Sequence, residues 1–211
     1  MNMQPITLED RVARLEPLSE SHIPDLMVAA QDESIWKFTR DGALRTEAQM
    51  LEFVRQLLAR QARGTDLPFT VVLQQTGCRS DRRSYRRSDR RSDRAIGMTR
   101  YLDIHPEDRG LEVGGTWYAV AWQRTAVNTE CKYLLLRHAF ETLGCIRVQI
   151  KTDLLNERSQ RAIERLGAVR EGVLRNHMIL PDGRIRDSVY YSVLDSEWPA
   201  VKARLEGFLA R

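Results

Sequence analysis

The sequence contains little cysteine, no long hydrophobic run and no recognisable export signal. Its three cysteines, Cys78, Cys131 and Cys145, have neither metal-binding nor redox spacing. Because Cys131 and Cys145 lie in apolar helix and strand patterns, we expect buried free thiols in a reducing cytoplasm. No apolar stretch is long enough to cross a membrane, and Met1–Asp10 lacks a basic head followed by an apolar segment. These absences predict a cytoplasmic protein that neither spans a membrane nor depends on disulfides.

The size and composition predict one folded domain over residues 1–211. A chain of 211 residues can bury a substantial core without disulfides. The hydrophobic fraction of 42% is ordinary for a globular protein. The cysteine spacing gives no reason to expect a bound metal.

One low-complexity segment, Arg79–Arg94, accounts for the basic character of the chain. It holds eight Arg and three Asp and carries +5, whereas the whole chain carries +4, so the other residues together carry −1. Its only apolar residue is Tyr85, so it cannot offset its ordering entropy, and we expect a flexible loop between two strands of a hairpin. One interpretation is an electrostatic arm for RNA, ribosomes or acidic partners, which would make a weak nucleic-acid contact. The other, favoured by the Ser-Asp-Arg-Arg periodicity, is a repeat expansion tolerated at a loop tip.

Hydrophobic periodicity predicts strands and helices in the order βααβββαβαββα. Such an order indicates an α/β (α+β) class, with a mixed sheet and helices on both faces. Strands are expected at Val12–Pro17, Phe69–Gln75, Ala95–Ile104, Glu112–Ala119, Cys145–Thr152, Gly172–Leu180 and Ile185–Leu194. Helices are expected at Glu20–Gln31, Thr46–Gln61, Thr129–Leu143, from Asn156 to Leu166, and at Ser196–Leu209.

The segment Trp122–Glu130 joins a predicted strand to a strongly helical run. A turn of this kind directs several backbone N–H groups and the positive end of a helix dipole at one spot, which suits a phosphate or pyrophosphate. A second strand follows, then Asn156–Ser159 opening another helix and Leu166–Ala168 closing it. Asn128 and Asn156 are the expected N-caps of the two helices.

Taken in that order, residues 112–172 resemble the acyl-CoA-binding core of the GNAT acetyltransferase superfamily, most closely its ribosomal-protein alanine N-acetyltransferase (RimJ/RimL-like) branch. The frame Gln123-x-x-Ala126-x-Asn128 stands where that family has its pyrophosphate loop. Two positions depart from the family's loop: Ala126 stands where the family has Gly, and Asn128 stands where it has Gly or Ala. The resemblance covers nearly the whole chain except the arginine segment. It implies a mostly antiparallel sheet of six to seven strands.

The resemblance implies that acetyl-CoA is the acyl donor. The pantetheine arm of the donor is expected beside Thr116, Trp117 and Tyr118, where Gly114–Gly115 in mid-strand allows close approach or a bulge. Asn156 is expected to contact the same arm. The remaining expected cofactor-binding residues form the loop and the helix start: Gln123, Arg124, Thr125, Ala126, Val127, Asn128 and Thr129.

Acyl transfer to an amine needs a base for the amine proton and a donor for the leaving thiolate. Ile163 occupies the position where many family members have an acidic tyrosine, so Ser159 is the candidate acid, as in the alanine-specific branch. A hydroxyl in a first helical turn can donate to a developing thiolate. Two candidates for the base remain open, Glu112 at a strand start and His177 on a later strand. Each of the three residues also has an ordinary structural explanation.

The acceptor is expected to be a primary amine, with a protein or peptide N-terminus, such as that of a ribosomal protein, favoured by the resemblance alone. A small-molecule amine, such as an amino acid, polyamine or antibiotic, is the alternative. Trp36 and Phe38 are expected in the wall of the acceptor pocket or as core residues, and Asp187 and Tyr190 as contacts to the ammonium group or to His177. The resemblance also allows a homodimer. A contrasting hypothesis is a non-catalytic acyl-CoA- or RNA-binding module.

Overall fold

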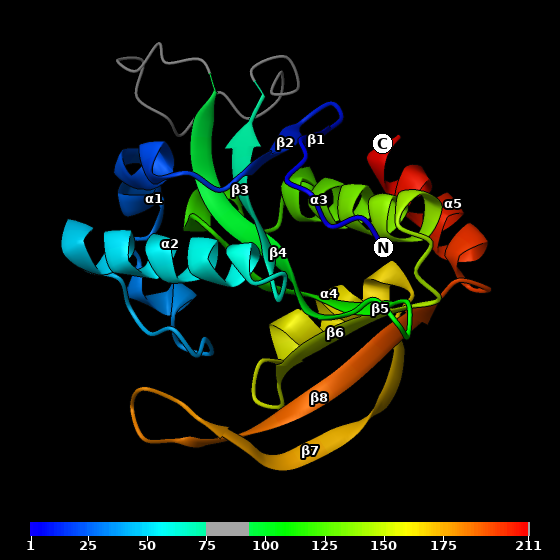
Figure 1. Cartoon of the computed structure of the whole chain (residues 1–211). Helices are drawn as coiled ribbons and strands as arrows, with labels where there is room; N and C mark the ends of the chain where they lie inside the picture. Colours follow the sequence, from blue (N-terminus) through cyan, green and yellow to red (C-terminus); the bar gives the residue numbers. More distant parts are fainter. Residues whose placement is uncertain (75–92, 211) are drawn as a thin grey trace.

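The computed structural model describes residues 1–74 and 93–210, and an eight-stranded sheet runs through its centre (Figure 1). The strand order is β1-β2-β3-β4-β5-β6-β8-β7, and every neighbouring pair is antiparallel except β5 and β6. The strands are β1 (Leu8–Glu9), β2 (Ala13–Pro17), β3 (Leu67–Leu73), β4 (Arg94–His105), β5 (Gly110–Tyr118), β6 (Arg147–Asp153), β7 (Val169–Ile179) and β8 (Ile185–Leu194).

Five α-helices of the described chain cover the two faces of this sheet. One face carries α1 (Ile23–Ala29) and α2 (Glu47–Ala62), which pack on β4 and β3. The other carries α3 (Ala126–Arg137), α4 (Glu157–Leu166) and α5 (Trp198–Leu209), with α5 packed against α3 and α4 (Figure 1). Short 3₁₀ turns lie at η1 (Glu20–His22), η2 (Glu33–Ile35) and η4 (Val120–Trp122), and α3 continues into a π-helical turn, η5 (His138–Thr142).

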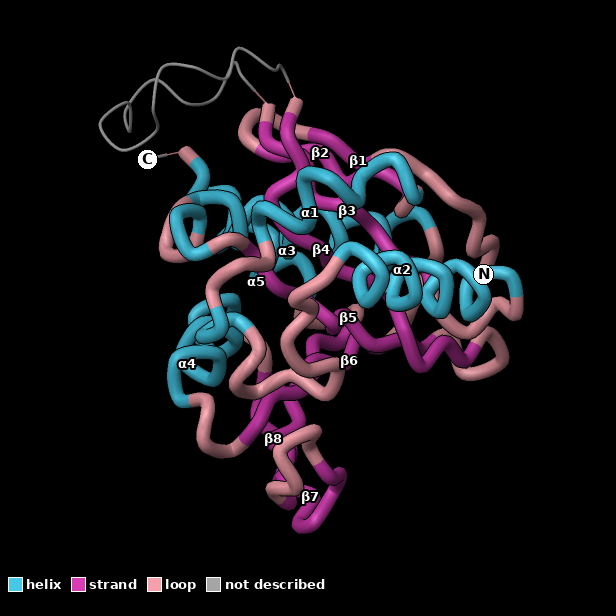
Figure 2. Tube along the Cα trace, turned by 90° about the vertical axis from the view of Figure 1, so that its left-hand side faces the viewer, coloured by secondary structure: helices cyan, strands magenta, loops and turns pink. Residues whose placement is uncertain are grey.

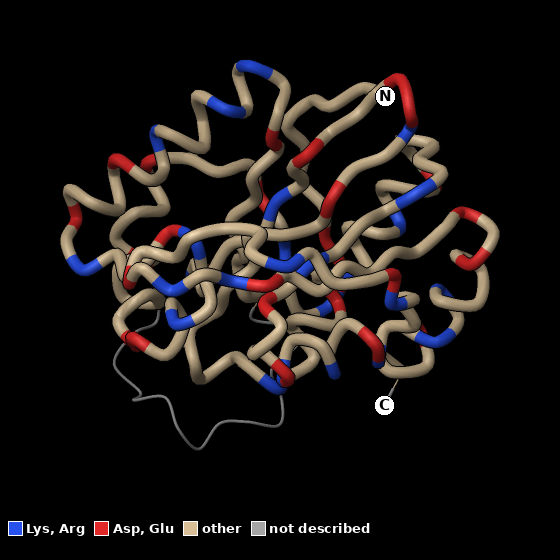
Figure 3. The backbone as a smooth tube through the Cα atoms, turned by 90° about the horizontal axis from the view of Figure 1, so that it is seen from below, with Lys and Arg blue, Asp and Glu red and all other residues tan. Residues whose placement is uncertain are grey.

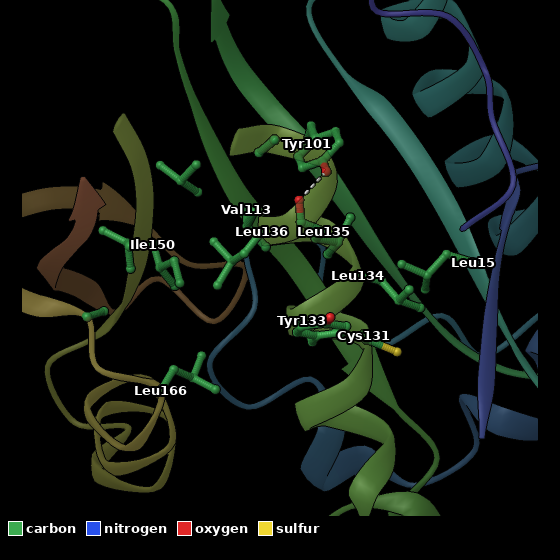
Figure 4. Close-up of a cluster of buried hydrophobic side chains, with 14 of the residues drawn as sticks. Leu15, Tyr101, Val113, Cys131, Tyr133, Leu134, Leu135, Leu136, Ile150 and Leu166 are labelled. Atoms are coloured by element: carbon green, nitrogen blue, oxygen red, sulfur yellow. Dashed lines mark hydrogen bonds between the residues drawn. The ribbon is translucent and has the colours of Figure 1, made fainter. Parts of the chain in front are cut away.

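The core is divided between the two faces. The larger cluster lies between the sheet and α3, α4 and α5, and Figure 4 shows Leu134–Leu136 of α3 within it. The Tyr101 hydroxyl donates to the Leu135 carbonyl at 2.6 Å there, which satisfies a buried polar group. Helix α3 is buried along most of its length, which is unusual for a helix that also carries charged residues. The smaller cluster lies under α1 and α2.

The fold class predicted from the sequence is confirmed. The observed order reproduces βααβββαβαββα with one addition, because the two-residue strand β1 pairs with β2 and brings the sheet to eight strands instead of six to seven. The pairing of only Leu8 with Leu15 and Glu9 with Arg14 is too short to leave a periodic signal.

Local capping signals position several helices correctly. Thr46 and Gln49 form a reciprocal capping box at the start of α2. Asn156 caps α4 by accepting from the Ser159 N–H at 3.1 Å, and Gly167 ends it in the left-handed conformation, with φ of 105°. The expected cap Asn128 is wrong: α3 begins three residues earlier, at Ala126, and Thr125 is its cap. The Thr125 side chain accepts from the Val127 N–H and so competes successfully for this role.

The arginine segment 79–94, with its expected flexibility and its weak nucleic-acid contact, lies outside the described residues apart from Asp93 and Arg94. Asp93 accepts from Arg14 at 3.3 Å, and Arg94 begins β4. Within the two described ranges, no helix has the length and apolar character needed to cross a membrane.

The β7–β8 hairpin forms the far edge of the sheet and extends away from the helices (Figure 2). Pro181–Gly183 forms its turn, with Gly183 in the left-handed region at φ of 82°. Between α2 and this hairpin, no helix of the described chain covers the sheet. On that face of the sheet, residues of β5, β6 and β8 line a groove.

Candidate active site

A groove of about 1600 Å³ passes through the sheet where β5 and β6 separate. These two parallel strands pair only from Gly110–Arg147 to Glu112–Gln149, and beyond that point they diverge. The starts of α3 and α4 line one end of the groove. The other end is lined by α2, by the loop that precedes it and by residues of β4, β6 and β8.

A bulge in β5 shapes the middle of the groove. The pairing of β4 with β5 shifts register between Met98 and Arg100, and Gly115 adopts φ of +56° at that point. A Cβ at Gly115 would lie 2.7 Å from Arg100 Nε, and one at Gly114 would lie 2.8 Å from Glu112 Oε1. The glycine pair therefore makes room for two charged side chains. Of the two uses that the sequence allowed for Gly114–Gly115, close approach of a ligand or a bulge, the structure shows the bulge.

Glu112 lies at the centre of the groove and is 2% exposed. Its Oε2 accepts from Lys151 Nζ at 2.7 Å and from Gln149 Nε2 at 2.9 Å. Both donors come from β6, across the point where the strands separate. A buried carboxylate next to open space, with its charge compensated by an ammonium group, is suited to accept a proton from a bound group or through water.

The starts of α3 and α4 face the same end of the groove. Arg124 precedes α3 in the left-handed conformation, with φ of 63°, and lines the groove with Thr125 and Ala126. Asn156 and Ser159 line it from α4. Arg158 and Arg165 of α4 line it as well, and Arg165 donates to Thr129 of α3 at 2.6 Å. Two helix N-termini and three arginines give this end the character of an anion site.

Residues 13–169 match the family of acetyltransferase (GNAT) domains. This chain belongs to the GNAT acetyltransferases. A solved structure from T. thermophilus, provisionally named an acetyltransferase, is 39% identical, with a TM-score of 0.83 over 99% of this chain and 100% of that one. A GCN5-related N-acetyltransferase from Brucella melitensis is 27% identical, with a TM-score of 0.84 over 98% of this chain and 86% of that one.

The printed name of one further relative is consistent with the RimJ/RimL-like branch predicted for this GNAT protein, and a second relative shares its fold. A Bacillus subtilis protein provisionally named ribosomal N-acetyltransferase YdaF is 33% identical over 106 residues, which is 50% of this chain and 57% of YdaF. The chain thus spans little more than half the length of that curated relative. Mycobacterium smegmatis RimJ, solved with CoA-disulfide, shares the fold with a TM-score of 0.76 at 18% identity over 96% of this chain and 94% of that one.

Most of the expected cofactor-binding residues of this GNAT protein line the groove, and one does not. Val127 is completely buried in the core, and its N–H is bonded to Thr125. The Tyr118 hydroxyl donates to Asn128 at 3.3 Å, which joins β5 to the first turn of α3. The lining set is Thr116, Trp117, Tyr118, Gln123, Arg124, Thr125, Ala126, Asn128, Thr129, Asn156 and Ser159.

Of the residues expected at the acceptor side or as the base, the structure places only some in the groove wall. Phe38 lines the groove, but Trp36 is 5% exposed and packs in the core against Trp117, with ring centroids 5.2 Å apart. His177 contacts Ser188 through Nδ1 at 2.9 Å and the Tyr190 hydroxyl through Nε2 at 3.3 Å. Asp187 accepts from the Asn176 N–H at 2.7 Å. Trp36, His177, Asp187 and Tyr190 are therefore not part of the groove wall.

Several charged residues of the groove were not predicted from the sequence. Lys132 lies on the buried side of α3, where its Nζ donates to Thr116 Oγ1 at 2.8 Å. Burial lowers the pKa of Lys132 to about 8. Arg100, Lys151 and Arg186 line the groove as well. An unusual lysine in the apolar run of α3 was the one available sequence signal, because the other three resemble ordinary strand residues that alternate with apolar ones.

Replacing Lys132 with Met is expected to raise the free energy of unfolding at pH 7 by about 1–3 kcal/mol. The folded-state pKa lies below the ordinary value, so the unfolded state binds more protons, and the stability of the native protein rises as the pH increases from about 8 to 10.5. The advantage of the Lys132→Met variant should therefore shrink over that range. Urea unfolding at pH 7 and pH 10 measures it. Lys202→Met, at a partly exposed lysine paired with Glu141, is the matched control, and a Lys132→Met protein less stable than wild type at pH 7 contradicts the expectation.

Proposed function

We propose that the protein is an acetyl-CoA-dependent N-acetyltransferase that transfers the acetyl group directly to a primary amine. The observation that supports this proposal is the continuous groove through the sheet at the separation of β5 and β6. It joins an anion-binding end, at α3 and α4, to a buried carboxylate, Glu112, at its centre. Donor and acceptor can therefore enter from opposite ends and meet beside the base without a covalent enzyme intermediate.

The residues at the α3–α4 end fit the donor substrate. Backbone N–H groups at two helix starts, together with Arg124, Arg158 and Arg165, suit the phosphate groups of CoA. Trp117 also lines the groove, and its indole Nε1–H is buried without an acceptor in the described part of the chain. An acceptor oxygen from the bound donor would satisfy it. Thr116 and Asn156 are placed to contact the pantetheine arm.

Acyl transfer then needs two proton movements. An amine attacks the thioester carbonyl only when neutral, and a free amine is mostly protonated near neutral pH. We assign Glu112 as the base that accepts the amine proton, directly or through water, because it is the predicted base that faces the groove. We assign Ser159 as the donor to the leaving thiolate, because it lines the groove in the first turn of α4.

The favoured acceptor is a protein or peptide N-terminus, including that of a ribosomal protein, and this proposal is supported by the name of the relative YdaF. A small-molecule amine is the alternative. The buried free thiols Cys131 and Cys145 support a place in the reducing cytoplasm. A homodimer is compatible with the proposal and is not required by the site.

Release of free thiol from acetyl-CoA tests the proposed function. The acceptors are short peptides that start with Ala, Ser or Met, free amino acids, polyamines and aminoglycosides. Turnover with any of them supports an acetyltransferase and identifies the class of acceptor. If acetyl-CoA binds by calorimetry but no acceptor causes thiol release, the protein is a non-catalytic acyl-CoA-binding module instead.

Replacing Ser159 with Ala is expected to lower kcat about 100-fold while the affinity for acetyl-CoA changes little. The hydroxyl is needed only as the thiolate leaves, so its loss affects the transition state more than the bound ground state. The measurement is kcat and KM for acetyl-CoA with the best acceptor of the panel. Ser196→Ala, at an exposed serine just before α5 and outside the groove, is the control. A kcat within about threefold of wild type removes Ser159 as the acid.

A further inference from the structure

One buried arginine at the acceptor end of the groove has no carboxylate partner within the described part of the chain. Arg186 of β8 is 7% exposed and lines the groove. Its Nε donates to Ser188 Oγ at 3.0 Å and its Nη1 donates to the Phe38 carbonyl at 3.2 Å. These bonds use two of the five N–H groups of a guanidinium, and the other three make no hydrogen bond within residues 1–74 and 93–210.

Two other cations of the groove, the half-buried Lys151 and the buried Arg100, differ from Arg186 in this respect, whereas the buried Lys132 also has no carboxylate within 4.0 Å among the described residues. Lys151 pairs with Glu112 at 2.7 Å. Arg100 Nε lies 3.4 Å from Asp66 Oδ2, close enough to compensate its charge although the pair lacks hydrogen-bond geometry. No carboxylate among the described residues lies within 4.0 Å of Arg186. Burial lowers the pKa of its guanidinium, and the more distant carboxylates of Asp153 and Glu112 oppose that shift only in part. A buried guanidinium without a contacting carboxylate gains stability from a ligand that supplies a counter-charge in direct contact with it.

Two further cations line the groove from the loop that precedes α2. These are Lys37 and Arg40, and both are exposed. The nearby His177 has a lowered pKa, first because of its burial and then because of the positive charges of Lys151, Arg186 and Arg40. Figure 3 shows positive and negative residues interspersed along the described backbone, and the groove lining likewise includes the acidic residues Asp41 and Glu52.

We propose that the acceptor carries a carboxylate close to its amine, and that Arg186, assisted by Arg40 at the mouth, binds that carboxylate while the amine faces Glu112. The inference rests on the proposed acetyltransferase function and specifies its substrate class. A planar guanidinium with free N–H groups pairs well with a carboxylate, and the gain is greatest where water is excluded. The same cations repel polyamines and aminoglycosides, whose own amines are protonated at neutral pH.

The first test compares acceptors that differ only in charge, with the wild-type protein and thiol release from acetyl-CoA. Peptides that start with Ser-Asp, Ser-Asn and Ser-Lys form one series, and free aspartate, asparagine and asparagine amide form the other. We expect kcat/KM to fall at least about tenfold from the acidic to the neutral member of the active series, mainly through KM, and further for the Lys peptide. The two series distinguish a side-chain carboxylate of a peptide from the carboxylates of a free amino acid.

The second test removes the guanidinium. Arg186→Gln is expected to raise the KM of an acidic acceptor roughly 30-fold or more and to leave that of its neutral counterpart nearly unchanged. Arg186→Lys should restore part of the preference for the acidic acceptor that Arg186→Gln loses. Lysine keeps the positive charge but cannot donate two parallel hydrogen bonds to a carboxylate as the planar guanidinium does. Arg175→Gln, at an exposed arginine of the same hairpin, is the matched control.

The possible results separate this inference from the function on which it rests. Equal rates for acidic and neutral acceptors, or a preference for the Lys peptide, overturn the carboxylate assignment but keep the acetyltransferase. No turnover of any amine overturns both. Because Arg186 is buried, thermal unfolding of each variant is compared with wild type, and if Arg186→Gln does not fold, the charge series on the wild-type protein and Arg40→Gln decide.

Discussion

Replacing Glu112 with Gln is expected to lower kcat by about 10²- to 10⁴-fold, with a much smaller change in the affinity for acetyl-CoA. The substitution keeps the size of the side chain and removes only its charge and its ability to accept a proton. Glu112 is buried at the centre of the groove, between the donor end and the acceptor end. Steady-state thiol release and calorimetric binding of acetyl-CoA together measure the effect.

The control for Glu112 is a carboxylate in a similar position that does not face the groove. Asp103 Oδ2 lies 3.4 Å from Nε2 of the same Gln149 that donates to Glu112, and it is largely solvated. Asp103→Asn should therefore keep kcat within about twofold of wild type. A Glu112→Gln enzyme with nearly full kcat would exclude Glu112 as the base and leave the proton to water alone or to a group outside the groove wall, such as His177.

Replacing Trp36 with Ala is expected to lower the free energy of unfolding by about 3–5 kcal/mol. The indole is buried, packs against Trp117 and donates its Nε1–H to the Ala30 carbonyl at 3.0 Å. Its loss would leave a cavity beneath α1 and α2 and an acceptor carbonyl without its donor. Chemical denaturation monitored by circular dichroism measures the change.

Phe38 provides the comparison, because it comes from the same short loop but lines the groove and is only half-buried. Phe38→Ala should cost less stability and should instead raise the KM of the acceptor. The opposite outcome is a Trp36→Ala protein whose free energy of unfolding lies within about 1 kcal/mol of wild type and whose KM for the acceptor alone is raised. That result would indicate that Trp36 lines the acceptor pocket.

Local signals in the sequence predicted most of the elements because their causes lie within a few residues. The capping box of Thr46 and Gln49, the cap at Asn156 and the left-handed Gly167 each involve neighbours in the chain. The start of α3 was predicted wrongly because local signals alone do not decide it. Two nearby candidates, Thr125 and Asn128, both suit a cap, and only the packing of Val127 in the core selects the earlier one.

The site residues were predicted less completely, because neither the alternation along a strand nor the residue types of a loop reveal what covers each side chain. Phe38 and Trp36 are two residues apart in an aromatic loop, yet one faces the groove and the other the core. His177 has a suitable residue type, but both of its ring nitrogens contact the side chains of Ser188 and Tyr190. Residue type and spacing could not distinguish these environments.

By itself, the sequence determined the fold class, the family and, of the two helix starts that face the donor end of the groove, that of α4. Each of these follows from periodicity, from caps and from a motif within a short stretch of chain. Only the tertiary structure decided which charges meet. Lys151 reaches Glu112 across 39 residues, and Arg186 reaches the Phe38 carbonyl across 148. Whether a charge is compensated depends on such distant partners and on burial. For that reason the lack of a contacting carboxylate at Arg186, and with it the proposed preference for an acidic acceptor, emerged only from the folded chain.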